Sequence, residues 1–351
     1  MFDLRAKQLS HSFKMALIIA AATMILSLSS KRVNASSASP IFAATALEIS
    51  PNRGDALAPA HYSYLASSLY PIPVYQGKVT SFDIKVIRDN QAEMDFGALL
   101  GDPELGQYHV RMTSGTSKGR CFLIEINNVE GTLYLSEDPS NWIEIGDSFV
   151  IERNPSLTAF FGKENSFSDL QSGKASDEAD LVSIMGNLGK LTSFYHHRSG
   201  SIPQSWQNAQ LGEAETTQIK PNQGLIIHRK SSSEGFIFTC GLVSDKAKTY
   251  ILNPGINLFG SGTLSESVSL DNLSLGHLTS GLNLFEADSI TIPSNNGSQK
   301  TYFQLQLDSS SIWVTENYHV ANSVLIQPGQ AFYINRLLSK PPISWTPSIS
   351  D

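Results

Sequence analysis

The chain has 351 residues, a formal net charge of −7, 41% hydrophobic residues, 16% charged residues and two cysteines. This acidic balance excludes the basic face that nucleic-acid binding requires and weakens any attraction to an anionic membrane surface. A chain of this length rarely forms one compact core, so we expect several modules.

Residues 1–35 have the order of a secretory signal: three basic residues, an uncharged, mostly apolar run at residues 15–30, and small or branched residues up to Ala35. We expect cleavage near Ala35 and export to the periplasm, the cell surface or the extracellular space. A retained anchor is the alternative because Lys31 and Arg32 follow the run, but its 16 residues fall short of the roughly 20 that cross a bilayer. Removing the signal takes the net charge to −11, since the segment has five basic residues against Asp3. No later segment is long and apolar enough to span a membrane as a helix.

After an N-terminal extension at residues 36–71, residues 72–153 have the pattern of a small β-barrel or sandwich. Short alternating or apolar runs, such as Gln107–Thr113 and Arg120–Ile126, are separated by turn residues. Five runs of this kind favour antiparallel strands that close around one core.

The rest of the chain contains an internal sequence repeat, whose two copies are offset by 107 or 108 residues. Trp206 matches Trp313, and Gln223 matches Gln330. A repeat of this length indicates duplication of a domain-sized unit. We therefore expect two related β-modules, at residues 154–240 and 241–338, with the same strand order. The whole chain is predicted to be all-β.

Two smaller features complete the domain plan. An Asn-Pro pair opens each copy, at Asn154-Pro155 and Asn253-Pro254. The Pro-rich tail at residues 339–351 is expected not to continue a sheet.

Paired carboxylates recur in both copies, as Glu178 with Asp180 and Glu286 with Asp288. Side chains at i and i+2 share a strand face, so each pair could bind calcium or act as acid and base in a hydrolase. The commoner use of such a pair is to bond local backbone amides near the module surface.

Repeated aromatic residues are the candidate ligand platform: Tyr195, Trp206, Tyr302 and Trp313. Planar rings exposed on a β-surface can stack on sugars, whereas cross-strand packing would bury them.

Other chemistry finds little support. The cluster of His196, His197 and His228 is a poor metal site, because adjacent strand residues point to opposite faces. No phosphate loop, zinc motif or nucleophile elbow is present, so we predict no catalytic residue, no metal and no cofactor. Cys121 and Cys240 lie in apolar runs, which favours two buried free thiols over one disulfide.

Three stretches carry a resemblance: Val74-Tyr-Gln-Gly77, Tyr108-His-Val-Arg111-Met-Thr113-Ser114-Gly115, and Gly146-Asp147-Ser-Phe149. They are similar to a family of conserved hypothetical exported proteins that occurs as many paralogues in Verrucomicrobia. The resemblance covers roughly residues 72–337 and departs from the family pattern at Asn154-Pro155-Ser156 and Pro203-Gln204. It implies an exported β-protein and carries over no catalytic residues.

The sequence therefore predicts an exported structural or interaction protein, with envelope proteins or glycans as partners. A carbohydrate-binding protein that assists polysaccharide degradation is the alternative.

Overall fold

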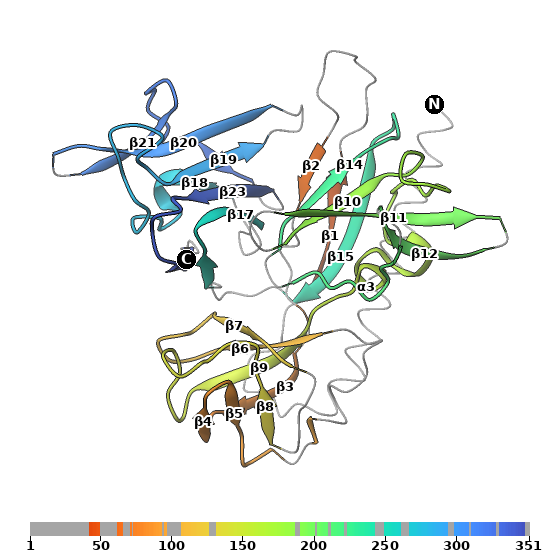
Figure 1. Ribbon diagram of the computed structural model, residues 1–351, viewed down its shortest axis with the longest axis horizontal. Coiled ribbons are helices and arrows are strands. Elements are labelled where there is room, and N and C mark those ends of the chain that lie inside the picture. The colour runs from red at the N-terminus through yellow and green to blue at the C-terminus, as the bar shows by residue number, and fades with distance from the viewer. Residues whose placement is uncertain are drawn as a thin grey trace. The chain divides into compact units, whose positions relative to one another are not determined.

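The computed structural model describes residues 42–49, 62–65, 71, 73–92, 95–96, 107–125, 131–186, 190–200, 202–209, 212–220, 223–242, 249–260, 267–293, 298–308, 310–327 and 330–347. Strands dominate, which confirms the all-β prediction (Figure 1). The helices described in full are short: α3 (Leu157–Phe161), η2 (Lys163–Asn165) and η4 (Leu270–Asn272). The signal segment and most of the extension at residues 36–71 lie outside the described residues.

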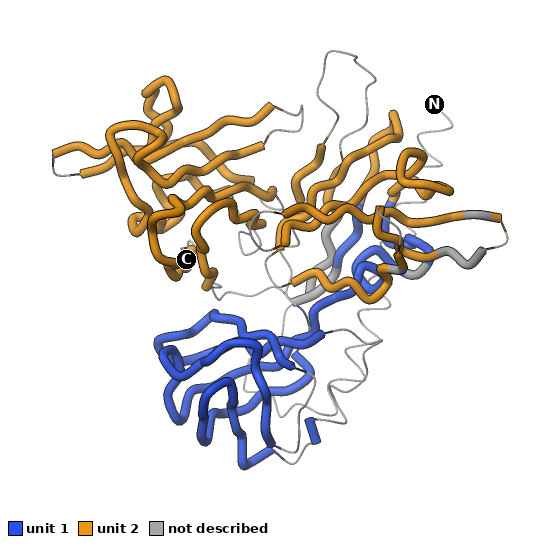
Figure 2. The backbone as a smooth tube through the Cα atoms, in the orientation of Figure 1, with its two compact units in different colours: residues 1–46, 69–168, 237–244 blue, residues 47–68, 169–236, 245–351 orange. Residues whose placement is uncertain are grey.

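The chain divides into two compact units (Figure 2). Unit 1 contains residues 1–46, 69–168 and 237–244, and unit 2 contains residues 47–68, 169–236 and 245–351.

Unit 1 holds two antiparallel sheets. One has the order β3 (Pro73–Lys78), β9 (Ser148–Arg153), β6 (Tyr108–Met112) and β7 (Cys121–Leu123), and the other has the order β4 (Ser81–Asp83), β5 (Val86–Arg88) and β8 (Thr132–Tyr134). Both contribute to one apolar core, with Val110, Phe122 and Phe149 from the first sheet and Ile87 and Leu133 from the second. The described strands form two sheets and do not close into the barrel that was one of the two expected forms.

Unit 2 holds two larger antiparallel sheets, here called the first and second sheets. The first sheet has the order β13 (Gly212–Glu213), β12 (Ile202–Asn208), β11 (Leu191–Ser199), β10 (Leu181–Met185), β14 (Leu225–His228) and β2 (Tyr62–Leu65). The second sheet has the order β17 (Gly255–Gly260), β23 (Ala331–Arg336), β19 (Ser289–Pro293), β20 (Gln299–Gln306) and β21 (Ser311–Thr315).

The two sheets share their register as well as their strand order. Val182 faces Phe194 in the first sheet and Ile290 faces Tyr302 in the second. Likewise, His196 faces Trp206, and Gln304 faces Trp313. Each of these pairs is related to its counterpart by the offset of the sequence repeat, so Trp206 and Trp313 occupy equivalent positions.

The edge strands differ from the expected domain boundaries. β2 pairs with β14 as β17 pairs with β23. The first sheet thus takes its edge strand from residues 62–65, inside the expected N-terminal extension, and residues 69–168 of unit 1 are inserted before the rest of that sheet. Asn154-Pro155 follows β9, whereas Asn253-Pro254 precedes β17, so the two Asn-Pro pairs are not equivalent.

The described residues also form three two-stranded sheets. β1 (Phe42–Ile49) pairs with β15 (Gly235–Leu242), β16 (Tyr250–Leu252) with β24 (Ile343–Trp345), and β18 (Val268–Ser269) with β22 (Leu325–Ile326). β24 shows that the expectation for the Pro-rich tail was wrong. The backbone beyond Pro342 is free to pair, and the Trp345 side chain is buried and donates its Nε1 proton to the Leu273 carbonyl at 2.8 Å.

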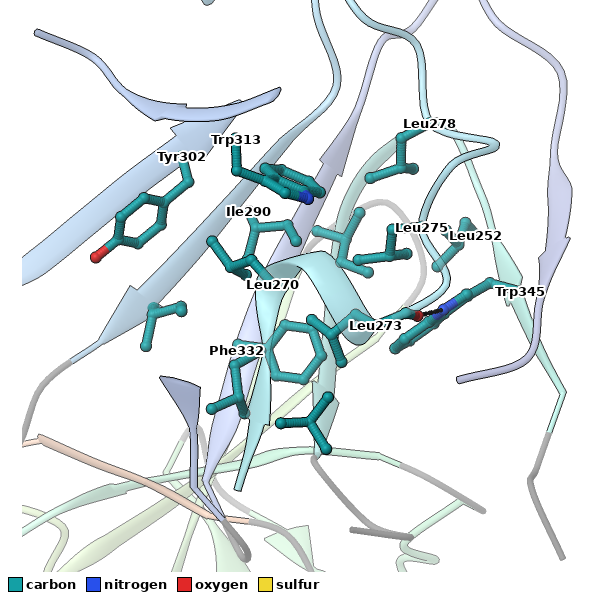
Figure 3. Packing of buried hydrophobic residues seen from close by; sticks show 14 of the residues in the cluster. Leu252, Leu270, Leu273, Leu275, Leu278, Ile290, Tyr302, Trp313, Phe332 and Trp345 are labelled. Atoms are coloured by element: carbon teal, nitrogen blue, oxygen red, sulfur yellow. Dashed lines mark hydrogen bonds between the residues drawn. The ribbon is translucent and has the colours of Figure 1, made fainter. Parts of the chain in front are cut away.

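The core of the second sheet lies on one face, around Ile290, Phe332, Trp313 and Trp345 (Figure 3). Leucines from the segment before β19 cover this face, among them Leu270, Leu273 and Leu275. Phe303 and Val314 alternate with core residues along β20 and β21 and pack on the opposite face with Ala287. Both faces of the hairpin are therefore partly covered.

The two sheets meet reciprocally within unit 2. Leu65 of β2 bridges to Gln330, and Phe259 of β17 bridges to Gln223. Leu65 is equivalent to Phe259, and Gln223 to Gln330. The same pair of positions therefore makes both contacts, with the roles of the two sheets exchanged. Such reciprocity is the mark of an isologous contact, the kind made by a two-fold axis.

Each glutamine also closes the turn before its own last strand. Gln223 accepts the Lys220 N–H and donates to the Met185 carbonyl at 2.7 Å, while Gln330 accepts the Gln327 N–H and donates to the Pro293 carbonyl at 3.0 Å. The repeated glutamine thus has the same bonds in both sheets.

Candidate functional site

The repeated aspartates are buried anchors. Asp180 accepts the backbone N–H groups of Gln171 and Lys230, and Asp288 accepts those of Thr279 and Leu337, at 2.6–2.9 Å. Each carboxylate thus ties the segment before β10 or β19 to a residue one or two positions beyond the end of β14 or β23.

An arginine stands beside each aspartate. Arg336 Nη1 donates to Asp288 at 2.8 Å, whereas Arg229 Nη1 lies 3.7 Å from Asp180. All four side chains are buried. The expected backbone bonding is present, but the expected location near the surface was wrong, because the arginine compensates the carboxylate charge inside the fold.

The repeated glutamates lie apart from this bonding. Glu178 accepts the Lys174 N–H and Glu286 the Leu282 N–H, and both glutamates are exposed. Each closes a short loop at a glycine, Gly173 or Gly281, where a Cβ would meet the glutamate at 2.7–2.8 Å. Since the glutamate is exposed and the aspartate buried, the pair does not converge as calcium ligands or as an acid–base pair.

The four candidate platform residues are all buried: Tyr195, Trp206, Tyr302 and Trp313. The Tyr195 hydroxyl donates to Gln207 at 2.8 Å, and the Trp206 ring packs edge-on against His196. Tyr302 and Trp313 belong to the second-sheet core (Figure 3). The exposure that sugar stacking requires is absent from all four rings.

The three histidines of the first sheet do different things. His196 is buried and bonds Ser172 at 2.8 Å, while His197 is its neighbour on the opposite face. His228 packs against Tyr62 at a ring separation of 4.9 Å, and burial, with help from Lys230, lowers the pKa of His228. Within the described ranges, no three His, Cys, Asp or Glu side chains are arranged to hold a metal ion.

A buried polar cluster in unit 1 escaped the sequence analysis. His109 faces Glu152 across β6 and β9, and Arg111 faces Cys121 across β6 and β7. His109 bonds Glu152 through Nε2 at 3.1 Å and Asn154 through Nδ1 at 2.8 Å. Arg111 donates two bonds to Glu152, through Nε at 3.0 Å and through Nη2 at 2.5 Å. We call these five residues the charged cluster.

Strong electrostatic coupling follows from burial of the cluster. Burial lowers the pKa of His109, but the Cys121 sulfur and the Glu152 carboxylate outweigh it and raise that pKa to about 9. Burial raises the pKa of Glu152, but His109 and Arg111 outweigh it and lower that pKa to about 2. The arrangement therefore holds an imidazolium and a carboxylate side by side near neutral pH.

The sequence did contain a signal for this cluster. His109 and Arg111 alternate with Tyr108, Val110 and Met112 in a predicted strand, so their shared face was visible. What the alternation could not show is that this polar face is covered rather than solvated.

Cys121 is a free thiol and is half-buried. The disulfide alternative is therefore not realised, and the expectation of full burial was wrong for Cys121. The side chain of Cys240 lies outside the described residues.

An exposed apolar tip lies beside the second sheet. Leu282 and Phe285 are 66% and 90% exposed, and Tyr318, 53% exposed, donates its hydroxyl to the Leu282 carbonyl at 3.4 Å. The equivalent loop of the first sheet carries exposed Lys174 and Asp177 in place of Leu282 and Phe285. The loop framework is shared while the exposed side chains differ.

Comparison of the chain with protein-family models, curated proteins and solved structures finds no match. Among the described residues, no helix has the length and apolar character needed to cross a membrane.

Proposed function

We propose that the protein is an exported structural or interaction protein of the cell envelope or extracellular space, without catalytic chemistry in its repeated modules. The apolar tip of Leu282, Phe285 and Tyr318 is the observation that carries this proposal. Large apolar side chains gathered on an exposed loop mark binding surfaces.

The repeated framework supports the same proposal. In both sheets the repeated aspartate and arginine form a buried ion pair with each other, Asp180 with Arg229 and Asp288 with Arg336. A duplicated scaffold that keeps its internal bonds and changes its exposed loop residues is suited to presenting surfaces. The sequence repeat and the shared register together favour an origin by duplication.

The polar groups of the tip favour a protein partner over a glycan. Asn283 donates to Glu286 at 2.8 Å and accepts the Phe285 N–H at 3.0 Å, while Glu286 also accepts the Leu282 N–H. Sugar recognition needs hydrogen-bonding groups beside the stacking ring, and these are already engaged. The side chains that stay exposed, Leu282 and Phe285, are apolar and would fit an apolar pocket on an envelope protein.

Site-specific photocrosslinking tests the proposal. A photoreactive phenylalanine at position 285 should give a discrete adduct with an envelope protein in intact cells. The same residue at position 177, its equivalent on the first sheet, should give none. Phe285→Asp should compete poorly for the captured partner. Absence of an adduct at 285, or binding on a glycan array that Phe285→Asp abolishes, would refute the protein-partner role.

A further inference from the structure

The loop that carries the apolar tip has a counterpart in the first sheet with the same backbone bonds. Gln306 donates its backbone N–H to the Gly281 carbonyl, and Arg198 donates its own to the Gly173 carbonyl, both at 2.9 Å. The repeat therefore serves as an internal control. Because the backbone bonds of the loop form in both sheets, side chains exposed in only one sheet are not needed to build the loop.

The two loops differ in charge as well as in apolar character. In the first sheet, Lys174 and Arg198 are exposed beside the loop. The equivalent residues of the second sheet are Leu282 and Gln306, which carry no charge. The second sheet therefore lacks both positive charges at the positions where it exposes its apolar tip.

Three exposed carboxylates lie beside the tip. Glu286 belongs to the tip loop itself and accepts the Leu282 N–H. Asp308 follows the end of β20, and Glu316 lies two residues before Tyr318 on the loop after β21. The apolar tip thus has an acidic rim, which we define as Glu286, Asp308 and Glu316.

No basic side chain close in sequence balances this rim. The chain has no lysine or arginine between Lys248 and Lys300, and none between Lys300 and Arg336. Lys300 lies six residues before Gln306 on β20, roughly 20 Å away along the strand, and Arg336 is buried against Asp288. Among the described residues, none of the three rim carboxylates forms an ion pair.

The backbone of the tip is fixed while its side chains stay exposed. The Tyr318 ring packs edge-on against Phe303 at a ring separation of 5.8 Å, and its hydroxyl bonds the Leu282 carbonyl. Asn283 accepts the Phe285 N–H at 3.0 Å, while the Phe285 side chain is 90% exposed. A surface that is already ordered loses little conformational entropy when it binds.

We propose that the partner of the apolar tip is a protein with an apolar pocket rimmed by lysine or arginine side chains. Phe285 enters the pocket, and Asp308 and Glu316 face the basic rim. Opposite charges at the rim speed association, whereas a buried aromatic anchor slows dissociation. The acidic rim disfavours an anionic membrane surface in the same place. This inference rests on the proposed interaction role and adds the chemistry of the partner.

Two double variants test the acidic rim at equal net charge. Asp308→Asn with Glu316→Gln removes two negative charges beside the tip. Asp177→Asn with Glu215→Gln removes two exposed negative charges of the first sheet and is the control. All four changes are at exposed positions, so thermal unfolding should show that both variants keep the fold.

The first probe is a chromatography matrix that carries benzyl groups beside quaternary ammonium groups. At pH 8, above the ordinary titration range of histidine, the rim variant should elute at lower salt than the control variant. Phe285→Ser should likewise elute earlier than the unchanged protein. If the rim and control variants elute together, the rim does not act with the tip and the proposal is overturned.

The second probe is the protein captured by the photoreactive residue at position 285, purified for binding kinetics. The rim variant should associate roughly fivefold more slowly than the control variant, and Phe285→Ser should dissociate roughly tenfold faster. Raising the salt from about 0.01 M to about 1 M should remove the difference in association rate, because the Debye length falls from roughly 30 to 3 Å.

The outcomes separate this inference from the proposed role. A captured protein whose association rate responds neither to salt nor to the rim variant overturns the basic rim and leaves the interaction role standing. An adduct with twice the mass of this chain identifies a second copy as the occupant and also overturns the basic partner. Failure to capture any protein overturns both. If the rim variant does not fold, the salt series on the unchanged protein decides alone.

Discussion

At the scale of single residues, the repeated aspartates make the same backbone hydrogen bonds in both sheets but form ion pairs of different length. Asp180 and Asp288 accept equivalent backbone N–H groups. Arg336 donates a direct bond to Asp288, whereas Arg229 lies further from Asp180. The difference between 2.8 and 3.7 Å makes the second sheet the one that depends more on its ion pair.

Asp288→Ala should destabilise the protein by roughly 3–5 kcal/mol, because it leaves the Arg336 guanidinium buried without its carboxylate. Asp180→Ala should cost less, since Arg229 makes the longer contact. Urea unfolding of both variants measures the difference. If both variants lose the same unfolding free energy, and less than about 1 kcal/mol, the two guanidinium groups are hydrated once the carboxylate is removed.

A second prediction at this scale concerns pH. The raised pKa of His109, about 9, gives stability that is complete below its ordinary value of 6.5 and is lost as the pH rises through 9. The lowered pKa of Glu152, about 2, gives stability that is present above 4.5 and is lost as the pH falls through 2. The unfolding free energy of unit 1 should therefore be greatest between about pH 4.5 and 6.5. His109→Gln should flatten the alkaline side, and an unchanged profile would contradict the coupling.

At the scale of elements, the repeat allowed the two copies to be predicted to share one strand order, because Trp206 with Trp313 and Gln223 with Gln330 mark equivalent positions in the sequence. The edge strand β2 could not be found this way. Four residues whose pairing partner lies over 150 positions away leave no local signal. β24 was missed because prolines dominate its surroundings, although they precede the paired residues.

Trp206→Ala and Trp313→Ala should each cost roughly 3–5 kcal/mol, since each removes a buried indole and leaves a cavity. The natural comparison is Trp142→Ala in unit 1, where the indole is 40% exposed and stacks on Arg120. Thermal unfolding should separate the two classes clearly. Losses at Trp206 and Trp313 no greater than at Trp142 would argue against their packing role.

The reciprocal contact between the sheets predicts a steric test. A Cβ at Gly224 would lie 2.7 Å from Leu258 Cγ and 3.2 Å from the Cβ of Ala331, its own equivalent. Gly224→Ala should therefore destabilise the contact by roughly 1–3 kcal/mol. Adding Leu258→Ala should recover part of this loss in a double-mutant cycle. Strictly additive effects of the two changes would mean that the sheets do not meet at this point.

At the scale of the whole molecule, composition and the N-terminal pattern predict export, while the structure shows the all-β architecture of the described residues. The sequence did not reveal that unit 1 is inserted after β2, because each segment has a regular strand pattern whichever sheet it joins. The charged cluster was hidden for a similar reason. Alternation shows which residues share a face, and only the assembled fold shows what covers it.

Export makes its own prediction. Protein recovered from outside the cytoplasm should begin within a few residues of Ser36, because the small-residue end of the signal lies at Ala35. N-terminal sequencing of that material is the measurement. Material that keeps residues 15–30 and stays with the membrane would support the retained anchor instead.

The late closure of the first sheet has a consequence for biosynthesis. Leu65 pairs with Leu225, 160 positions later, whereas Leu258 pairs with Tyr333, 75 positions later. On the ribosome, β2 stays unpaired while residues 69–168 are synthesised, because β14 has not yet been made. Segments that are made early and pair with distant segments are prone to misfold or to associate with other chains. We therefore expect the half of unit 2 that is translated first to depend more on chaperones, because a chain arrested before residue 225 still carries β2 without its pairing partner β14.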